Sequence, residues 1–468
     1  MNQEPKANEE FTEEEEFFAE SGKSEQDNGQ SKKNKSKKKQ RVIACVAAGA
    51  IALCSFLGGW LVNYFTWDKE MRSLARLKNR IQQSYFEEVT DEEFYGVLFS
   101  AVNERILDDY SWYMTEEEYA QTRAQAKGEQ SGLGLVFVTG AEGVEEMRVI
   151  RVSANSPAER AGIVAGEYIV GYGMSETVEK IENKVQAGES YFEHFAGFID
   201  GVKTGEKMYL QVRGIDGNER VLPIAKEKYV ENYVFYRTNK KSYGFDSESK
   251  AVARGDALAP LPDNAAYIRL TQFNGKAAEQ FDSAMELFVS EDKQRLVLDL
   301  RGNGGGYLDI MLEIARYFCK NSDKRKPLAA VADYGEKKEK FYATGNCYDD
   351  YFTDNSKIFV LADNQTASAS ECLLGVMLDY GTIEYKNICI AQRGDEVKTY
   401  GKGIMQTTYP LTGIYGDAVK LTTARILWPI SENCIHARGI LPADGALQVA
   451  ENPDFETETK NALSVLFG

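Results

Sequence analysis

Histidine is scarce in this chain, which holds only His194 and His436 among 468 residues. A histidine-based catalytic triad therefore has few candidates, although the scarcity does not exclude one, because a triad needs a single histidine. Positive charge is also in short supply, with 55 Lys and Arg residues against 72 Asp and Glu and a formal net charge of −17. This balance argues against a nucleic-acid partner, because phosphate binding depends on clustered Lys and Arg.

Cysteine is sparse, and its spacing matches neither a disulfide framework nor a zinc site. Cys45 and Cys54 lie in an apolar stretch near the N-terminus, and five more lie downstream. We therefore expect no metal and no cofactor, and at least one free thiol unless a cysteine pairs between chains. We expect Cys372 to be a buried packing residue. The five downstream residues are Cys319, Cys347, Cys372, Cys389 and Cys434.

The N-terminal region changes composition twice. It begins acidic and polar, continues with seven Lys and Arg within residues 32–41, and then forms an uncharged apolar stretch of 21 residues at 42–62. About 20 such residues span a bilayer core as a helix. We therefore predict a disordered cytoplasmic tail at 1–41 and a single transmembrane helix at 42–65. Because the basic run precedes the span, the positive-inside rule places residues 66–468 outside the cytoplasm.

Three alternatives to a membrane anchor fit the N-terminal region less well. A cleaved signal peptide would have a shorter apolar run and a shorter leader. A buried core helix does not explain the length of the run or its basic flank. A lipidated Cys54 would need small residues before it, and the sequence there lacks that pattern.

Glycines and short strands follow a predicted helical region at 66–127. The order is Ser-Gly-Leu-Gly-Leu-Val-Phe at 131–137, a strand, Ser-Pro-Ala-Glu-Arg-Ala-Gly-Ile at 156–163, and another strand. This order resembles a β-rich PDZ domain, which we assign to residues 128–228; the alternative is that the glycines only make a tight hairpin. The resemblance implies that loop N–H groups cap a peptide carboxylate while the peptide extends the sheet. It assigns peptide binding to Gly132, Leu133, Gly134 and Leu135, whereas Glu167 and Tyr172 depart from the usual pattern.

Repeated strand–turn–helix units predict an α/β core from residue 229 to residue 450, followed by a C-terminal segment at 451–468. The strands are short and mostly apolar, as a buried parallel sheet requires. Such units imply a mixed or parallel sheet with helices, and chemistry at the carboxyl ends of its strands. The expected strands are 265–270, 295–300 and 357–363, and the expected helices are 277–290, 308–319 and about 368–380.

Four motifs follow one another in this core: Asp-Leu-Arg-Gly-Asn-Gly-Gly-Gly at 299–306, Ala-Ser-Ala-Ser-Glu at 367–371, Asp-Tyr-Gly at 379–381 and Thr-Tyr-Gly-Lys-Gly at 399–403. In this order they resemble the carboxyl-terminal processing peptidases, family S41 of the serine proteases, over residues 90–450. The resemblance implies a serine endopeptidase that acts on polypeptides, through their C-terminal tails. By position it makes Ser368 the nucleophile, Lys402 the general base, Gln406 the group that orients the lysine, and Glu371, Asp379 and Thr399 supporting residues.

The chemistry of a serine–lysine pair makes sense of the glycines around the lysine. A serine hydroxyl needs a base, and a free lysine with a pKa of about 10.4 is charged at neutral pH. Burial lowers that pKa, and Gly401 and Gly403 permit a close backbone turn that directs Lys402 inward. For the oxyanion we expect the amide of Ala369 and a donor in the glycine run at Gly305.

Two features leave the function open. Ser368 with Glu371 also fits a helix capping box. The polar insert at 392–396 is expected to lengthen a hairpin; alternatively, it moves Lys402 out of reach of the serine. The second outcome would give a catalytically inactive S41-like protein that binds peptides or acts as a scaffold. A homo-oligomer is likewise left open.

Overall fold

The computed structural model describes residues 53–58, 68–137, 147–185, 190–254, 258, 260–320, 326–345, 348–353, 355–411, 416–452 and 454–467. The chain divides into two compact units, residues 1–98 and 99–468. The predicted tail at 1–41, and the predicted transmembrane helix at 42–65 apart from residues 53–58, lie outside the described residues. Within the described ranges, no helix combines the length and apolar character needed to cross a membrane.

Helices dominate residues 68–126, as predicted. Helix α2 (Lys69–Ser84) begins at Asp68, whose carboxylate accepts a hydrogen bond from the Met71 amide at 2.7 Å. Helix α4 (Glu116–Ala126) begins at Thr115, whose amide donates to the Glu118 carboxylate at 2.8 Å in a capping arrangement. Between them lie α3 (Asp91–Arg105), which starts in the first unit and ends in the second, and the short strand β1 (Trp112–Met114).

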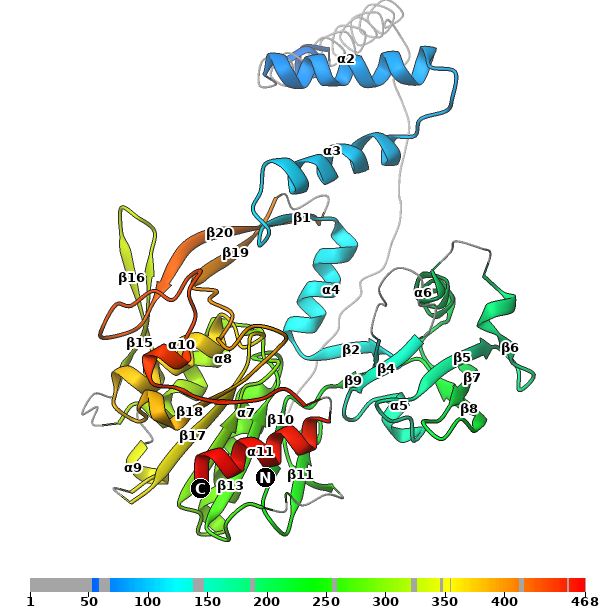
Figure 1. The fold of residues 1–468 in the computed structure, drawn as a ribbon. Helices are drawn as coiled ribbons and strands as arrows, with labels where there is room; N and C mark the ends of the chain where they lie inside the picture. Colours follow the sequence, from blue (N-terminus) through cyan, green and yellow to red (C-terminus); the bar gives the residue numbers. More distant parts are fainter. Residues whose placement is uncertain are drawn as a thin grey trace, which may run out of the picture. The chain divides into compact units, whose positions relative to one another are not determined.

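An eight-stranded mixed sheet forms the centre of the second unit (Figure 1). Its strand order is β12-β11-β10-β13-β14-β17-β18-β21, in which the last five strands run parallel and the first three pair antiparallel. The predicted α/β core is therefore present, and its three predicted strands are adjacent. The strands are β10 (Val234–Arg237), β11 (Ser242–Phe245), β12 (Ala251–Arg254), β13 (Ala265–Leu270), β14 (Arg295–Asp299), β17 (Lys357–Ala362), β18 (Ile388–Ala391) and β21 (Leu447–Val449).

Both faces of this sheet are covered, because successive strand residues point to opposite sides. Ala266 and Ile268 of β13 join a core with α7 (Ala277–Ser290), α8 (Leu308–Ala315) and α10 (Ala369–Asp379). On the other face, Ala265 and Tyr267 of the same strand pack with Ala462 and Leu463 of α11 (Phe455–Phe467). Figure 1 shows α11, in red, lying across that face. The sheet is thus the middle of three layers.

A second sheet holds the strand that follows the predicted lysine. Its order is β1-β20-β15-β16, with β19 also paired to β20. Strand β1 joins from the helical region, since Trp112 lies opposite Lys420. The sequence did not predict this sheet. Its strands are β15 (Leu328–Asp333), β16 (Lys338–Tyr342), β19 (Ile404–Pro410) and β20 (Ala418–Leu427).

A β-rich insertion, predicted at 128–228, has its own apolar core. It is entered and left through the antiparallel pair β2 (Glu129–Gly132) and β9 (Glu227–Val230). Both residues that depart from the PDZ pattern have structural roles: Glu167 pairs with Arg220 at 2.6 Å, and Tyr172 is buried. Its sheet has the order β3-β4-β5-β7-β8, made of β3 (Leu135–Phe137), β4 (Met147–Val152), β5 (Tyr168–Gly173), β7 (Lys207–Arg213) and β8 (Glu219–Ala225), with α6 (Tyr191–Gly201) beside it.

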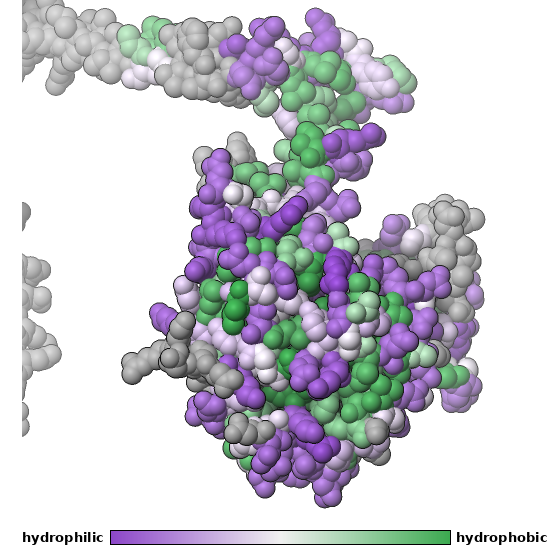
Figure 2. Space-filling view, turned by 60° about the vertical axis from the view of Figure 1, so that its left-hand side comes forward, coloured by the Kyte–Doolittle hydropathy of each residue, from purple (hydrophilic) through white to green (hydrophobic). Residues whose placement is uncertain are grey.

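The surface is mixed in character. On the face seen in Figure 2, polar residues in purple are interspersed with apolar residues in green, as is usual for a folded protein. Five cysteines lie in the described ranges, and all are free thiols; Cys347 lies outside those ranges. Cys372 is 3% exposed within the main core, which confirms its expected packing role.

Candidate active site

Ser368 lies in the turn between strand β17 and helix α10, at the N-terminus of the helix, as predicted. Its backbone has φ 56° and ψ −115°, a conformation that non-glycine residues rarely adopt. Backbone strain of this kind persists only where the surrounding structure enforces it, and it is concentrated at functional sites. The backbone conformation of Ser368 therefore favours a functional role over that of a simple helix cap.

A buried carboxylate connects the serine to the lysine segment. Glu371 is 1% exposed and accepts hydrogen bonds from the backbone amides of Ser368 at 3.1 Å and Lys402 at 2.8 Å. It also accepts from the Gly401 amide at 2.8 Å and from the Thr399 hydroxyl at 2.6 Å. Burial raises the pKa of Glu371, and these four hydrogen bonds oppose the rise. Glu371 and Thr399 thus hold the two backbone segments together.

The glycines around Lys402 allow close packing, as predicted. A Cβ on Gly401, which has φ 87°, would lie 2.9 Å from the backbone nitrogen of Arg438. A Cβ on Gly403 would lie 2.7 Å from the backbone nitrogen of His436. The turn can therefore press against residues 436–439 only because neither flanking residue has a side chain.

Ser368, Lys402 and Gln406 all line one pocket, together with the glycine run at 304–306. Burial lowers the pKa of Lys402 below its usual 10.5, the positive charge of Lys420 lowers it further, and Asp108 acts in the opposite direction. A lysine in such a place has an increased neutral fraction, which a general base requires. Neither histidine is among the described residues that line this pocket.

Ser368 and Lys402 line the same pocket, but their side chains are not hydrogen-bonded to each other in the described structure. Among the described residues, no hydrogen bond joins the Ser368 hydroxyl to the Lys402 amine; instead, the Lys402 Nζ lies 4.8 Å from the centroid of the Tyr110 ring. The side-chain nitrogen of Gln406 is buried and has no hydrogen-bond partner. Catalytic hydrogen bonds are often long in ligand-free enzymes and shorten when substrate binds.

Backbone donors lie beside the serine. The Ala369 amide, at the N-terminus of α10, donates to no acceptor in the described part of the chain. The Gly305 amide donates to the Asn303 side chain at 2.9 Å, whereas the amides of Gly304 and Gly306 have no acceptor among the described residues. A Cβ on Gly305 would lie 2.8 Å from the Ser368 Cβ, so this run touches the nucleophile turn. Ala369 and the glycine run can thus supply donors for an oxyanion.

Asp379 does not join this cluster. It lies at the opposite end of α10, where its carboxylate accepts hydrogen bonds from the amides of Ile430 at 2.8 Å and Ser431 at 2.9 Å. Asp379 thus binds the turn after strand β20 and makes no hydrogen bond to the Ser368–Lys402 cluster in the described structure.

Sequence reasoning missed three residues of the pocket region. Lys420 and Trp112 line the pocket, and Tyr110 covers the lysine amine. The Lys420 Nζ lies 4.3 Å from the centroid of the Trp112 ring. The signal was weak, because these residues come from segments some 300 positions apart that only the pairing of β1 with β20 brings together.

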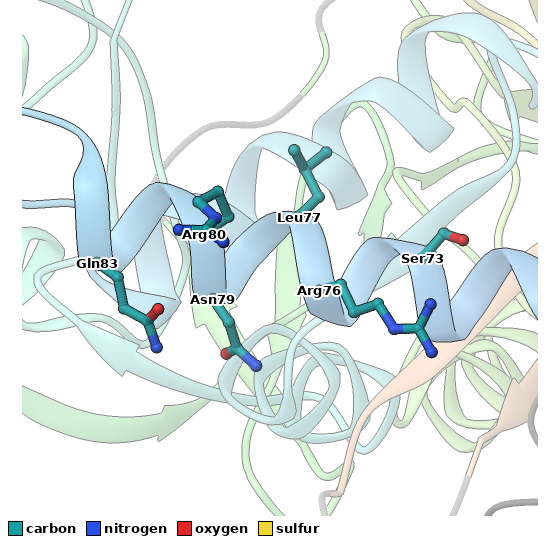
Figure 3. A pocket seen from close by; sticks show the side chains of 6 residues that line it. All are labelled: Ser73, Arg76, Leu77, Asn79, Arg80 and Gln83. Carbon is teal, nitrogen blue, oxygen red and sulfur yellow. The ribbon is translucent and has the colours of Figure 1, made fainter.

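Two further hollows are lined by other parts of the chain. The β-rich insertion has a groove lined by Gly132, Leu133, Gly134 and Leu135, next to the edge strand β3. Phe192 and Phe195 of α6 form its apolar wall. The hollow in Figure 3 is lined in the described residues by α2 alone and includes no predicted site residue. In the parts of the chain that the structure describes, no cluster of His, Cys, Asp and Glu could hold a metal ion.

Comparisons with known proteins agree with the motifs. Residues 264–444 match peptidase family S41. The carboxy-terminal processing protease CtpB of Bacillus subtilis is 25% identical over 377 residues, which cover 80% of this chain and 67% of that protein. The carboxyl-terminal-processing protease of Picosynechococcus is 28% identical over 348 residues, which cover 74% of this chain and 72% of that protein.

A solved structure, the photosystem II D1 C-terminal processing protease, has 22% sequence identity and a TM-score of 0.43, and the match covers 88% of this chain and 96% of that chain. The family match and the two relatives confirm the resemblance that the four core motifs indicate. Residues 264–444 therefore match the family S41 peptidase domain, and the chain is a serine-type peptidase similar to the carboxyl-terminal processing proteases.

Proposed function

We propose that the chain is a membrane-anchored serine endopeptidase that cleaves C-terminal tails or unfolded proteins outside the cytoplasm. The observation that carries this proposal is the shared carboxylate of Glu371, which binds the backbone amides of both Ser368 and Lys402. A serine and a lysine with a lowered pKa are thereby held at one pocket.

In the proposed reaction, the neutral amine of Lys402 takes the proton of the Ser368 hydroxyl as the serine oxygen attacks the scissile carbonyl. The oxyanion that forms is stabilised by the Ala369 amide and an amide of the glycine run. The protonated lysine then returns the proton to the leaving amine, and water hydrolyses the acyl-enzyme. Gln406 would orient the lysine amine, and it lines the same pocket as Ser368 and Lys402.

The groove of the β-rich insertion supports a role in substrate binding or gating. It lies at an edge strand, where an extended peptide can pair, and Gly132 to Leu135 offer backbone N–H groups for a terminal carboxylate. Gln272 and Asn274 line both this groove and the pocket of Ser368, so the two are neighbours.

The membrane anchor and the location rest on the N-terminal sequence. The apolar run at 42–62 is long enough to span a bilayer, and the basic run before it favours a cytoplasmic N-terminus.

One observation favours a second candidate, a catalytically inactive protein that binds peptides on the same fold. The Ser368 hydroxyl and the Lys402 amine make no hydrogen bond in the described structure. Cleavage of an unfolded protein by the full-length chain, measured beside Ser368→Ala, tests both candidates. We expect turnover by the wild type and none by the variant; equal background in both would favour the inactive protein.

A further inference from the structure

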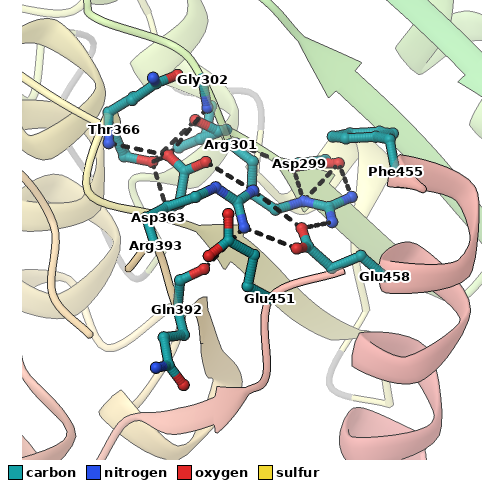
Figure 4. Close-up of polar contacts among 12 residues, drawn as sticks. Asp299, Arg301, Gly302, Asp363, Thr366, Gln392, Arg393, Glu451, Phe455 and Glu458 are labelled. Carbon is teal, nitrogen blue, oxygen red and sulfur yellow. Dashed lines mark hydrogen bonds and ion pairs between the residues drawn. The ribbon is translucent and has the colours of Figure 1, made fainter. Parts of the chain in front are cut away.

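A network of buried ionic side chains joins the active-site loops to helix α11 (Figure 4). Asp299, Arg301 and Glu458 are 0%, 1% and 1% exposed, and none of them takes part in the proposed proton transfers. Arg301 donates to Asp299 through Nε at 3.0 Å and to Glu458 through Nη1 at 2.8 Å. Its guanidinium carbon lies 4.2 Å from the centroid of the Phe455 ring, also on α11.

A second guanidinium comes from the insert at 392–396. Arg393 donates to the two carboxylate oxygens of Glu458, at 2.6 Å and 2.9 Å, and pairs with Asp363 at 3.1 Å. The insert makes a tight turn in which Arg393 and Glu396 exchange backbone hydrogen bonds. The Glu458 carboxylate therefore accepts hydrogen bonds from two guanidinium groups, that of Arg301 in the glycine run and that of Arg393 in the insert.

The network reaches the two loops that meet at the active site. Arg301 opens the glycine run, and the amide of Gly302 donates to Asp363 at 3.0 Å. Asp363 begins the nucleophile turn, and the Ala367 amide donates to the Asn303 carbonyl at 3.0 Å. A shift of either guanidinium would therefore move the glycine run relative to Ser368.

Apolar packing also attaches α11, since Ala462 and Leu463 are buried in the core on that face of the sheet. Burial would raise the pKa of Glu458, but the hydrogen bonds from Arg393 and the Asn452 amide and the charges of Arg393 and Arg301 outweigh it, so the pKa lies below its usual value. A fully paired buried network adds little net stability, and its best-supported use is to select one geometry.

We propose that Glu458 is a positioning residue for catalysis, which holds the glycine run and the nucleophile turn in their active arrangement through Arg301 and Arg393. This inference rests on the proposed function, because it assigns Glu458 a part in the same serine–lysine reaction. The oxyanion donors act in the transition state, so a loss of positioning lowers kcat more than it raises KM.

The test compares Glu458→Gln with Glu456→Gln in the full-length chain. Glu456 lies on the same helix and forms a two-pronged pair with Arg237 at 2.9 Å and 3.1 Å, away from both loops. We expect Glu458→Gln to lower kcat by about 10- to 100-fold with KM within about threefold. Glu456→Gln should change both by less than about twofold, although it too removes an ion pair of α11.

Two further measurements keep the inference testable if Glu458→Gln is poorly folded. Arg393→Gln, on a partly exposed turn, should lower kcat by about three- to tenfold; an unchanged kcat would overturn the proposal. Backbone hydrogen exchange at residues 302–306 and 367–371 should quicken in Glu458→Gln but not in Glu456→Gln. Equal exchange in the two variants, or equal kcat, would overturn it as well.

The exchange measurement needs no activity, so it separates the two hypotheses. If the wild-type chain fails to cleave any unfolded protein, the proposed function is wrong. The exchange data then still decide whether Glu458 holds the loops.

Discussion

Lys402 is subject to opposing electrostatic influences. Burial and the charge of Lys420 lower its pKa, and Asp108 raises it, with a net effect below 10.5. Lys420 itself contacts the Trp112 ring and, in the described structure, forms no ion pair. The charge of Lys420 therefore has no carboxylate partner in the described structure, which favours a neutral Lys402 amine.

We predict that Lys402→Ala abolishes proteolysis and leaves the fold intact, because it removes a base from a partly exposed position. Lys402→Arg should also fail, since a guanidinium does not deprotonate near neutral pH. Turnover and thermal unfolding check both variants. Lys398→Ala is the control, because it removes an outer lysine that pairs with Glu396. Retention of most wild-type turnover by either Lys402 variant would contradict the serine–lysine assignment.

The pH dependence follows from the direction of the pKa shift. The base is the neutral amine, so kcat/KM should rise as pH increases through the lowered pKa of Lys402. Lys420→Met removes one lowering influence, so the rising limb should move to higher pH. Lys386→Met, on the surface, should leave it in place. A flat profile from about pH 6 to 10 would be inconsistent with a lysine base.

At the scale of elements, local patterns were good predictors. Strand β13 and helix α7 have the predicted limits, because apolar periodicity and turn residues are local signals. Helix α8 ends at Ala315, and a 3₁₀ turn at Arg316–Phe318 completes the predicted helix at 308–319. The order of motifs likewise pointed to Ser368, Lys402 and Glu371. In the structure, Ser368 and Lys402 line one pocket, and the Glu371 carboxylate accepts hydrogen bonds from the backbone amides of both.

The pairing of strands far apart in the chain could not be predicted from the sequence. Nothing local shows that β1 pairs with β20, and so the roles of Tyr110, Trp112 and Lys420 were missed. We expected the insert at 392–396 only to lengthen a hairpin. Its ion pair with Glu458 was not predicted, because Glu458 lies 65 positions from Arg393. Such contacts depend on how elements pack and leave no periodic signal in either segment.

The glycine run allows a test at the level of one loop. Gly305 has φ 102°, and a Cβ there would lie 2.9 Å from the Ala369 nitrogen, whereas a Cβ on Gly304 would meet nothing within 4 Å. Because the new Cβ would displace the Ala369 amide, we predict that Gly305→Ala lowers kcat/KM by at least about 100-fold, the scale of a lost oxyanion donor. Gly304→Ala should stay within about threefold. Similar kinetics for the two variants would exclude close contact between the run and the serine.

At the scale of the molecule, the β-rich insertion is connected to the core through the β2–β9 pair. A Cβ on Gly134, which has φ 80°, would clash with the Ser156 side chain. We predict that Gly134→Val weakens cleavage of substrates with free C-terminal tails more than cleavage of short internal peptides. Gly197→Val, in open space on α6, is the control. Equal losses on both substrates would argue that the groove does not select tails.

The proposed topology has its own test. Protease added to intact cells should digest the folded region and spare a tag on the N-terminus, because the basic run at 32–41 favours the cytoplasmic side. The assay is a blot for the tag before and after cell lysis. Digestion of the tag with protection of the folded region would reverse the orientation.

The link between Arg301 and Glu458 spans 157 positions of the chain. Synthesis proceeds from the N-terminus, so the nucleophile turn leaves the ribosome well before helix α11 does. A nascent chain that has already made Ser368 thus lacks Glu458, the shared partner of Arg301 and Arg393. Peptidase activity would then arise only after helix α11 has been synthesised and has packed against the sheet.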